Sequence, residues 1–157
     1  VPSRTGIGIT AETYKVLSEH PNINGAKEAS GDFSLFSKTR YLCGDALNIW
    51  SGNDDNTVAM MALGAKGVIS VASNIVPKAV ADMCDAALKG DFRTAQDIHM
   101  KYANLFSTLF VETNPIPVKT AMNLMGMNVG HLRLPLVDMQ PGNLEKLKAC
   151  LKELDLI

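Results

Sequence analysis

Short apolar runs alternate with longer segments of helical pattern over the first 90 residues. The apolar runs begin near Ile23, Leu47 and Gly67. Their spacing of roughly 20 to 25 residues is close to the length of one βα unit in an eight-unit barrel. Helical patterns cover residues 10–20, 32–43, 54–63 and 73–88. Because apolar strands that alternate with helices are typical of a parallel sheet, we predict an α/β fold for this part of the chain.

The last third of the chain has a helical pattern only. Such patterns cover residues 92–112, 119–125 and 143–154. Pro115 and Pro117 end the first of them, because proline cannot continue a helix. We therefore predict two parts, with the α/β part over residues 1–90 and a C-terminal helical domain over residues 91–157.

The α/β part contains only four βα units, and the strand of the first unit would end near Val1. Four parallel strands in an open half-barrel leave two unpaired edges and an exposed inner face. The strands form either a doubly wound sheet or the C-terminal half of a (β/α)8 TIM barrel, and the incomplete first motif favours the half-barrel. We therefore expect the isolated chain to fold poorly. The chain joined to the expected N-terminal half is called the assembled barrel below.

Composition and charge exclude several classes of function. The 157 residues carry 15 basic and 16 acidic side chains, a net charge of −1, so nucleic acid and anionic membrane surfaces are not expected partners. No apolar run approaches the roughly 20 residues of a membrane span. Three widely spaced cysteines, without a Cys-x-x-Cys pair, indicate reduced thiols in a cytoplasmic protein and no zinc site.

Lys27 is the strongest candidate for a catalytic residue. It stands at the C-terminal end of a predicted buried strand, the end at which catalytic groups gather in parallel α/β folds. Burial there would favour the neutral amine, which attacks ketones to form an imine. Glu28 should point to the opposite face, toward the helices, and needs a partner there. The alternative is that Lys27 simply extends from the end of the strand into solvent.

Three further positions are candidates for substrate binding. Arg4 follows the expected remnant of the first strand and suits a substrate carboxylate, although an ordinary surface arginine is the alternative. The backbones at Gly52 and Ile69 end the next two strands and could line the same site. Asp54 and Asp55 follow Gly52; a helix cap is the preferred interpretation of this pair, and a metal-binding loop is the alternative.

The chain resembles the pyruvate-dependent class I aldolase family. The matching segments occur in order along nearly the whole sequence: VPSRTG (1–6), GAKEASGD (25–32), SGND (51–54), GVISV (67–71), NPIPVK (114–119) and LRLPL (132–136). The resemblance implies that Lys27 forms a Schiff base with pyruvate and that the backbone near Gly52 and Ile69 lines the pyruvate pocket. An arginine at the position of Arg4 implies a lyase that condenses pyruvate with L-aspartate-4-semialdehyde in lysine (diaminopimelate) biosynthesis.

The resemblance also implies no metal, no organic cofactor and a homotetrameric assembly. The family's proton-shuttle tyrosine and its pyruvate-carboxylate threonines would lie before Val1, in the expected N-terminal half of the barrel. Two alternatives to this interpretation remain. One is a sister aldolase of a sugar acid, and the other is a non-catalytic module that is active only when assembled with the N-terminal half.

Overall fold

The computed structural model describes residues 1–157 and contains eight α-helices, three 3-10 helices and two β-strands. The elements up to β2 are α1 (Pro2–Thr5), α2 (Ala11–Ser18), β1 (Gly25–Glu28), α3 (Phe33–Cys43), η1 (Gly44–Ala46) and β2 (Asn48–Ser51). The later elements are η2 (Asp54–Asn56), α4 (Thr57–Ala62), η3 (Ala72–Asn74), α5 (Pro77–Leu88), α6 (Phe92–Thr108), α7 (Ile116–Leu124) and α8 (Pro141–Glu153). None of these helices combines the length and the apolar character needed to cross a bilayer.

The sheet is parallel, as predicted, but shorter than predicted. β1 and β2 pair in a register that places Lys27 beside Trp50. The apolar run at residues 67–71 does not form a full strand, and Val68 makes only an isolated parallel bridge with Ser51. Two backbone hydrogen bonds hold this bridge, from the Ser51 N–H to the Gly67 carbonyl (2.9 Å) and from the Ile69 N–H to the Ser51 carbonyl (2.8 Å). A third backbone hydrogen bond joins Lys66 N to the Ile49 carbonyl (2.8 Å), so the third strand is reduced to a short stretch of pairing with β2.

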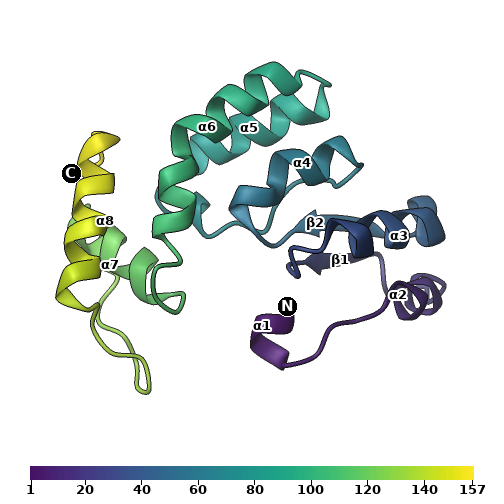
Figure 1. The fold of residues 1–157 in the computed structure, drawn as a ribbon, viewed down its shortest axis with the longest axis horizontal. Coiled ribbons are helices and arrows are strands. Elements are labelled where there is room, and N and C mark those ends of the chain that lie inside the picture. The colour runs from purple at the N-terminus through teal and green to yellow at the C-terminus, as the bar shows by residue number, and fades with distance from the viewer.

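Only one face of this small sheet is covered. Ile49 and Ser51 are buried on the side of the helices, whereas Lys27 and Ile69 are exposed on the other side. This alternation follows from the pleat of the strands, which sends successive side chains to opposite faces. Figure 1 shows α3 and α4 beside β1 and β2, with α5 beyond α4, while α1 lies apart from them. The uncovered side is called the open face below.

The helical part packs on the α/β part through one continuous core. α5 and α6 lie side by side (Figure 1), and α6 and α7 both contact α8. The core is a cluster of 25 buried residues that includes Tyr14 near one end of the chain and Leu151 near the other. The predicted division at residues 90 and 91 falls between α5 and α6, which are in close contact. That division stays a prediction.

Several helix starts differ from the prediction. Asp32 and Asp91 cap α3 and α6 by accepting hydrogen bonds from Leu35 N (2.9 Å) and Thr94 N (3.0 Å). The starts predicted at residues 73 and 143 are wrong, because α5 begins at Pro77 and α8 at Pro141. Proline suits the first helical position, since it has no N–H to leave unsatisfied and its φ is already helical.

The segment before α2 also differs from the prediction. A strand remnant was expected before Arg4, but residues 2–5 form the single turn α1, which begins at Pro2. Gly6 ends the turn with a left-handed φ of 71°, and its N–H donates to the Pro2 carbonyl. A proline at the start and a glycine just past the end are the residues that such a turn favours.

We expect the isolated 157-residue chain to lack a cooperative thermal transition as a monomer. The open face and both sheet edges would face water, and the sheet has only two full strands. Circular dichroism melting combined with sedimentation measures this. A single sharp transition from a monomeric species would contradict the expectation, and the assembled barrel is the positive control.

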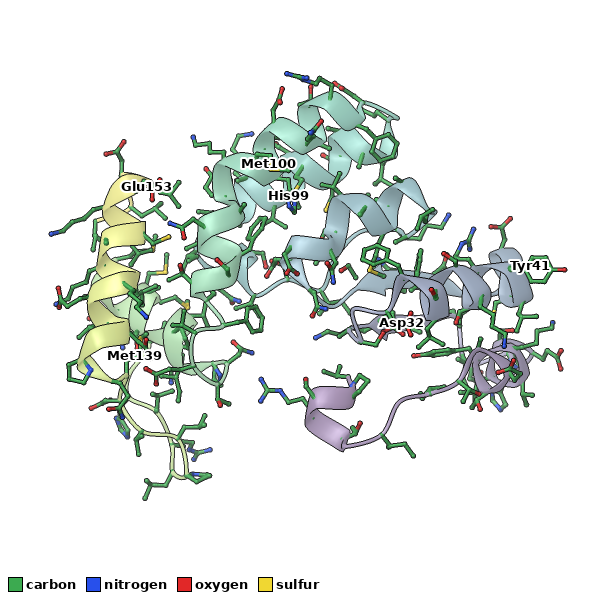
Figure 2. All side chains as sticks on the ribbon, viewed as in Figure 1. Asp32, Tyr41, His99, Met100, Met139 and Glu153 are labelled. Carbon is green, nitrogen blue, oxygen red and sulfur yellow. The ribbon has the colours of Figure 1, made fainter.

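A half-buried histidine predicts a loss of stability in acid. His99 lies on α6 (Figure 2), its Nδ1 is buried without a hydrogen-bond partner, and its ring packs edge-on against Phe106 at 5.5 Å. Burial lowers the pKa of His99, and the Asp55 carboxylate only partly opposes this. Below the ordinary histidine pKa of about 6.5 the unfolded chain binds more protons than the folded one, so stability falls as the pH falls.

When the pH is lowered from 7.5 to 5.5, the thermal midpoint of the assembled barrel should therefore fall by less in the His99→Leu variant than in the parent. His131→Leu is the matched control, because His131 is exposed. Equal losses in the parent and in His99→Leu would show that His99 does not contribute to the acid sensitivity.

Candidate active site

The side chain of Lys27 projects from β1 onto the open face. The prediction that this strand buries it is wrong for this chain, because Lys27 is exposed and nothing in residues 1–157 covers that face. The neighbouring Glu28 points the other way and is only 7% exposed, as predicted. Its carboxylate accepts a hydrogen bond from Ser30 N at 2.5 Å. Burial raises the pKa of Tyr14, and the nearby Glu28 carboxylate raises it further.

Lys27 lies directly across Gly52, the first residue after β2. A Cβ at position 52 would come within 2.8 Å of Lys27 Cε and within 2.5 Å of Ala29 Cβ. These distances are shorter than real Cβ contacts. The flexible lysine could move aside but the Ala29 Cβ could not, so a side chain at position 52 would displace Lys27 and strain the ends of the strands. The structure thus places Lys27 and Gly52, two of the predicted site residues, in direct contact.

Trp50 shares the open face with Lys27 and was not among the predicted site residues. It lies beside Lys27 in the register of the strands. A Cβ at Gly25 would come within 2.3 Å of the indole ring, and one at Gly67 would lie 3.6 Å from it. The indole therefore lies over one glycine and beside another, and adds an apolar surface to the open face. The spacing Gly25-x-Lys27 was the available signal, because a glycine in a strand marks a close approach.

Ile69 lies on the same open face, one step along the sheet. Its side chain is 47% exposed, and its N–H pairs with the Ser51 carbonyl. The carbonyl of Ile69 accepts no hydrogen bond from any residue of the chain. A backbone carbonyl left free at the end of a strand is available to a ligand or to a neighbouring strand.

Asp54 does not cap the next helix, so that prediction is wrong. The carboxylate is 2% exposed and accepts hydrogen bonds from the Ser70 hydroxyl, from Val71 N (3.0 Å) and from Ala72 N (3.1 Å). It thus joins the end of β2 to the loop after Ile69. The structure contains no group of three or more His, Cys, Asp or Glu side chains that could hold a metal ion.

Arg4 is held away from the strands, against the turn between α6 and α7 in the helical part. Its guanidinium donates a hydrogen bond to the Asn114 carbonyl at 3.1 Å, in the turn between α6 and α7. A cavity of about 230 Å³ separates the α1 segment from the end of β1, and its lining includes Pro2 and Ser30. The structure brings Lys27, Gly52 and Ile69 onto one face, whereas no contact joins Arg4 to Lys27.

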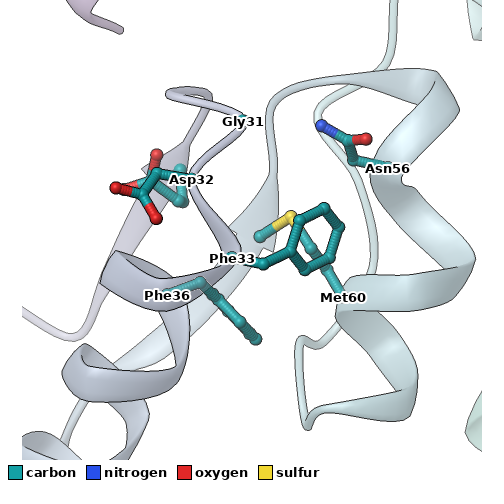
Figure 3. Close-up of a pocket in the computed structure, with 7 residues that line it drawn as sticks. Gly31, Asp32, Phe33, Phe36, Asn56 and Met60 are labelled. Atoms are coloured by element: carbon teal, nitrogen blue, oxygen red, sulfur yellow. The ribbon is translucent and has the colours of Figure 1, made fainter.

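A smaller cavity lies on the helix side of the sheet and is not part of this site. Figure 3 shows it between α3 and α4, with Phe33 and Met60 in its lining. Its volume of about 10 Å³ leaves room for at most one water molecule. This cavity is too small for a substrate, so the chemistry suggested by the sequence belongs to the open face.

Comparison with known proteins matches both the sequence and the fold. The model of the "Dihydrodipicolinate synthetase family" matches residues 1–154. A 4-hydroxy-tetrahydrodipicolinate synthase of Clostridium novyi is 50% identical over 152 residues, which cover 97% of this chain and 51% of that protein. The chain spans about half the length of the curated relatives it matches.

Solved structures agree with the sequence comparison. The dihydrodipicolinate synthase of Aquifex aeolicus superposes with a TM-score of 0.95 at 46% identity, over 99% of this chain and 54% of that one. The enzyme of Acinetobacter baumannii, described as chloride-inhibited and complexed with pyruvate, superposes with a TM-score of 0.96 at 39% identity, over 100% of this chain and 54% of that one. The predicted fold, half of a (β/α)8 barrel followed by a helical region, is confirmed. The chain belongs to the dihydrodipicolinate synthetase family.

Proposed function

We propose that the assembled barrel condenses pyruvate with L-aspartate-4-semialdehyde, and that Lys27 of this chain is the Schiff-base residue. One observation carries the proposal: the amine lies across Gly52 at the C-terminal end of a parallel strand, on a face that this chain leaves open. The names of the curated relatives support the reaction, and the pyruvate complex of the Acinetobacter baumannii enzyme supports the first substrate.

The expected chemistry begins at the Lys27 amine. The neutral amine attacks the ketone of pyruvate, and loss of water leaves an imine. The imine draws electrons from the adjacent methyl group, whose deprotonation gives an enamine. The enamine carbon attacks the aldehyde of the semialdehyde, and the semialdehyde's amino group then closes the ring by displacing Lys27, which gives 4-hydroxy-tetrahydrodipicolinate. No metal or organic cofactor is needed for these steps.

The N-terminal half of the barrel has a physical role in this scheme. Lys27 is exposed in the chain as it stands, and a hydrated ammonium is a poor nucleophile. Closing the barrel over the open face would exclude water and favour the neutral amine. We therefore place the catalytic activity in the assembled barrel and not in this chain alone.

We assign the remaining predicted site residues supporting roles. Arg4 uses one N–H on the Asn114 carbonyl and keeps other donors for the carboxylate of the semialdehyde. The free carbonyl of Ile69 and the backbone at Gly52 would line the pyruvate pocket.

We also propose a cytoplasmic homotetramer. The three cysteines are free thiols, which fits a reducing compartment. Tyr41 is 86% exposed and Leu63 49% exposed, and apolar side chains of this size on the helix side fit contacts between subunits. The proposed division into residues 1–90 and 91–157 would then separate the catalytic strands from the helical part.

Borohydride reduction in the presence of pyruvate tests the role of Lys27. We expect the assembled barrel to gain one pyruvate adduct, which peptide mass spectrometry locates at Lys27, because borohydride reduces the imine to a stable amine. Lys27→Arg should abolish the adduct. Lys66→Arg is the matched control, since Lys66 is also an exposed lysine near the sheet and should leave the adduct unchanged.

An adduct on another lysine, or none in the assembled barrel, would defeat the proposal. Separate assays without borohydride, in which the assembled barrel receives either pyruvate with aspartate semialdehyde or sugar acids, identify the substrates. Turnover only with the sugar acids would assign the chain to a sister aldolase instead.

The Gly52→Ala variant tests the packing of the amine. A methyl group at position 52 would overlap Lys27 and Ala29, and overpacking of this kind costs about 1–3 kcal/mol. We expect the rate of adduct formation to fall by at least about tenfold, because the amine is displaced from its attack position. Gly142→Ala in α8 is the control, since a Cβ there meets nothing within 4 Å. Equal trapping rates in the two variants would show that Gly52 does not position Lys27.

A further inference from the structure

The most completely bonded buried charge in the molecule is the carboxylate of Asp54. It is 2% exposed and lies in η2, just beyond the end of β2. One oxygen accepts from the Ser70 hydroxyl, and the other accepts from Val71 N and Ala72 N. A buried carboxylate is costly unless its lone pairs are satisfied, and here two backbone donors and a hydroxyl satisfy them.

These bonds fix a segment that the sheet alone holds weakly. Residues 67–71 form only one bridge, to Ser51, and the carbonyl of Ile69 has no partner in the chain. On the N-terminal side of Ile69, the bridge sets the backbone. On its C-terminal side, the Asp54 carboxylate binds the next three residues, Ser70, Val71 and Ala72. Ile69 is therefore held at both ends while its carbonyl stays unpaired.

Ser70 extends the same network. Its hydroxyl donates to Asp54 and accepts from Ser73 N at 2.8 Å, so its orientation is fixed from both sides. Ser73 in turn donates from its own hydroxyl to the Ser70 carbonyl at 3.3 Å. The turn that follows Ile69 is thus organised by a charge contributed from a neighbouring βα unit.

We propose that Asp54 is a positioning residue of the pyruvate pocket, which fixes the direction of the Ile69 carbonyl through Ser70, Val71 and Ala72. Asp54 itself does not touch the substrate. The inference rests on the proposed function, because it assigns the Ile69 backbone to the pocket. It goes further by identifying what holds that backbone in place where regular β-pairing is absent.

Borohydride trapping over a range of pyruvate concentrations, in the assembled barrel, separates positioning from stability. Asp54→Ala removes all three bonds, and we expect the pyruvate concentration for half-maximal trapping to rise by about tenfold. Asp54→Asn keeps an oxygen for the two backbone N–H groups, so we expect a rise of about twofold or less. Ser70→Ala removes one bond and should give about threefold. Adduct yield at saturating pyruvate should stay close to that of the parent.

Asp55→Ala is the matched control, because Asp55 is the adjacent acidic residue but is exposed and makes no hydrogen bond. It should leave the trapping curve unchanged. Thermal midpoints of all variants are recorded in parallel. If Asp54→Ala fails to assemble, the Ser70→Ala and Asp54→Asn curves decide the question.

Lower thermal midpoints with unchanged trapping curves would overturn the inference and leave Asp54 a purely structural residue. The same holds if Asp54→Asn shifts the curve as much as Asp54→Ala, since geometry is then not what matters. Absence of any adduct in the parent protein is a different result, because it would overturn the proposed function itself.

Discussion

The pleat of β1 and β2 is the constraint on which the rest of the structure depends. It sends Glu28, Ile49 and Ser51 toward the helices and leaves Lys27 and Trp50 on the opposite face. The helix side is closed by the chain's own core, whereas the open face is not. One face of the sheet is therefore buried and the other is open. As a result, adjacent residues of one strand have separate roles: those facing the helices contribute to stability, and those on the open face are available for chemistry. A shift of one residue in register would bury the amine and expose the core.

Much of this arrangement could be predicted from the sequence, because it follows from local rules. The alternation of apolar runs and helices gave the parallel α/β fold, and the pleat alone placed Lys27 and Glu28 on opposite faces. The burial of Lys27 was predicted wrongly, since burial depends on what covers the open face and not on the strand itself. Residues 67–71 have the β-branched composition of a strand, yet pairing requires neighbours, and here only Ser51 provides one.

Asp54 is an example of a residue whose hydrogen-bond partners were predicted wrongly from the local sequence. An acidic residue shortly before a helical pattern suggests a cap for that helix. Nothing in the sequence indicates that other donors would bind the carboxylate instead. In the structure the donors lie 16 to 18 residues further along the chain, and they become neighbours only because parallel strands end at the same edge of the sheet. A contact between two βα units cannot be deduced from the pattern of either unit alone.

The glycines show how the same edge makes room for chemistry. Gly52 has no special φ, so its value lies in the missing Cβ, which leaves space for the Lys27 side chain. At the opposite end of β1, Gly25 leaves space in the same way for the Trp50 indole. Strand ends that lack side chains would be poor structural elements by themselves, because they bury little and pack loosely. Packing is lost in this way on the open face. The carboxylate of Asp54 offsets the loss, because its hydrogen bonds hold the loop after Ile69 without placing a side chain on that face.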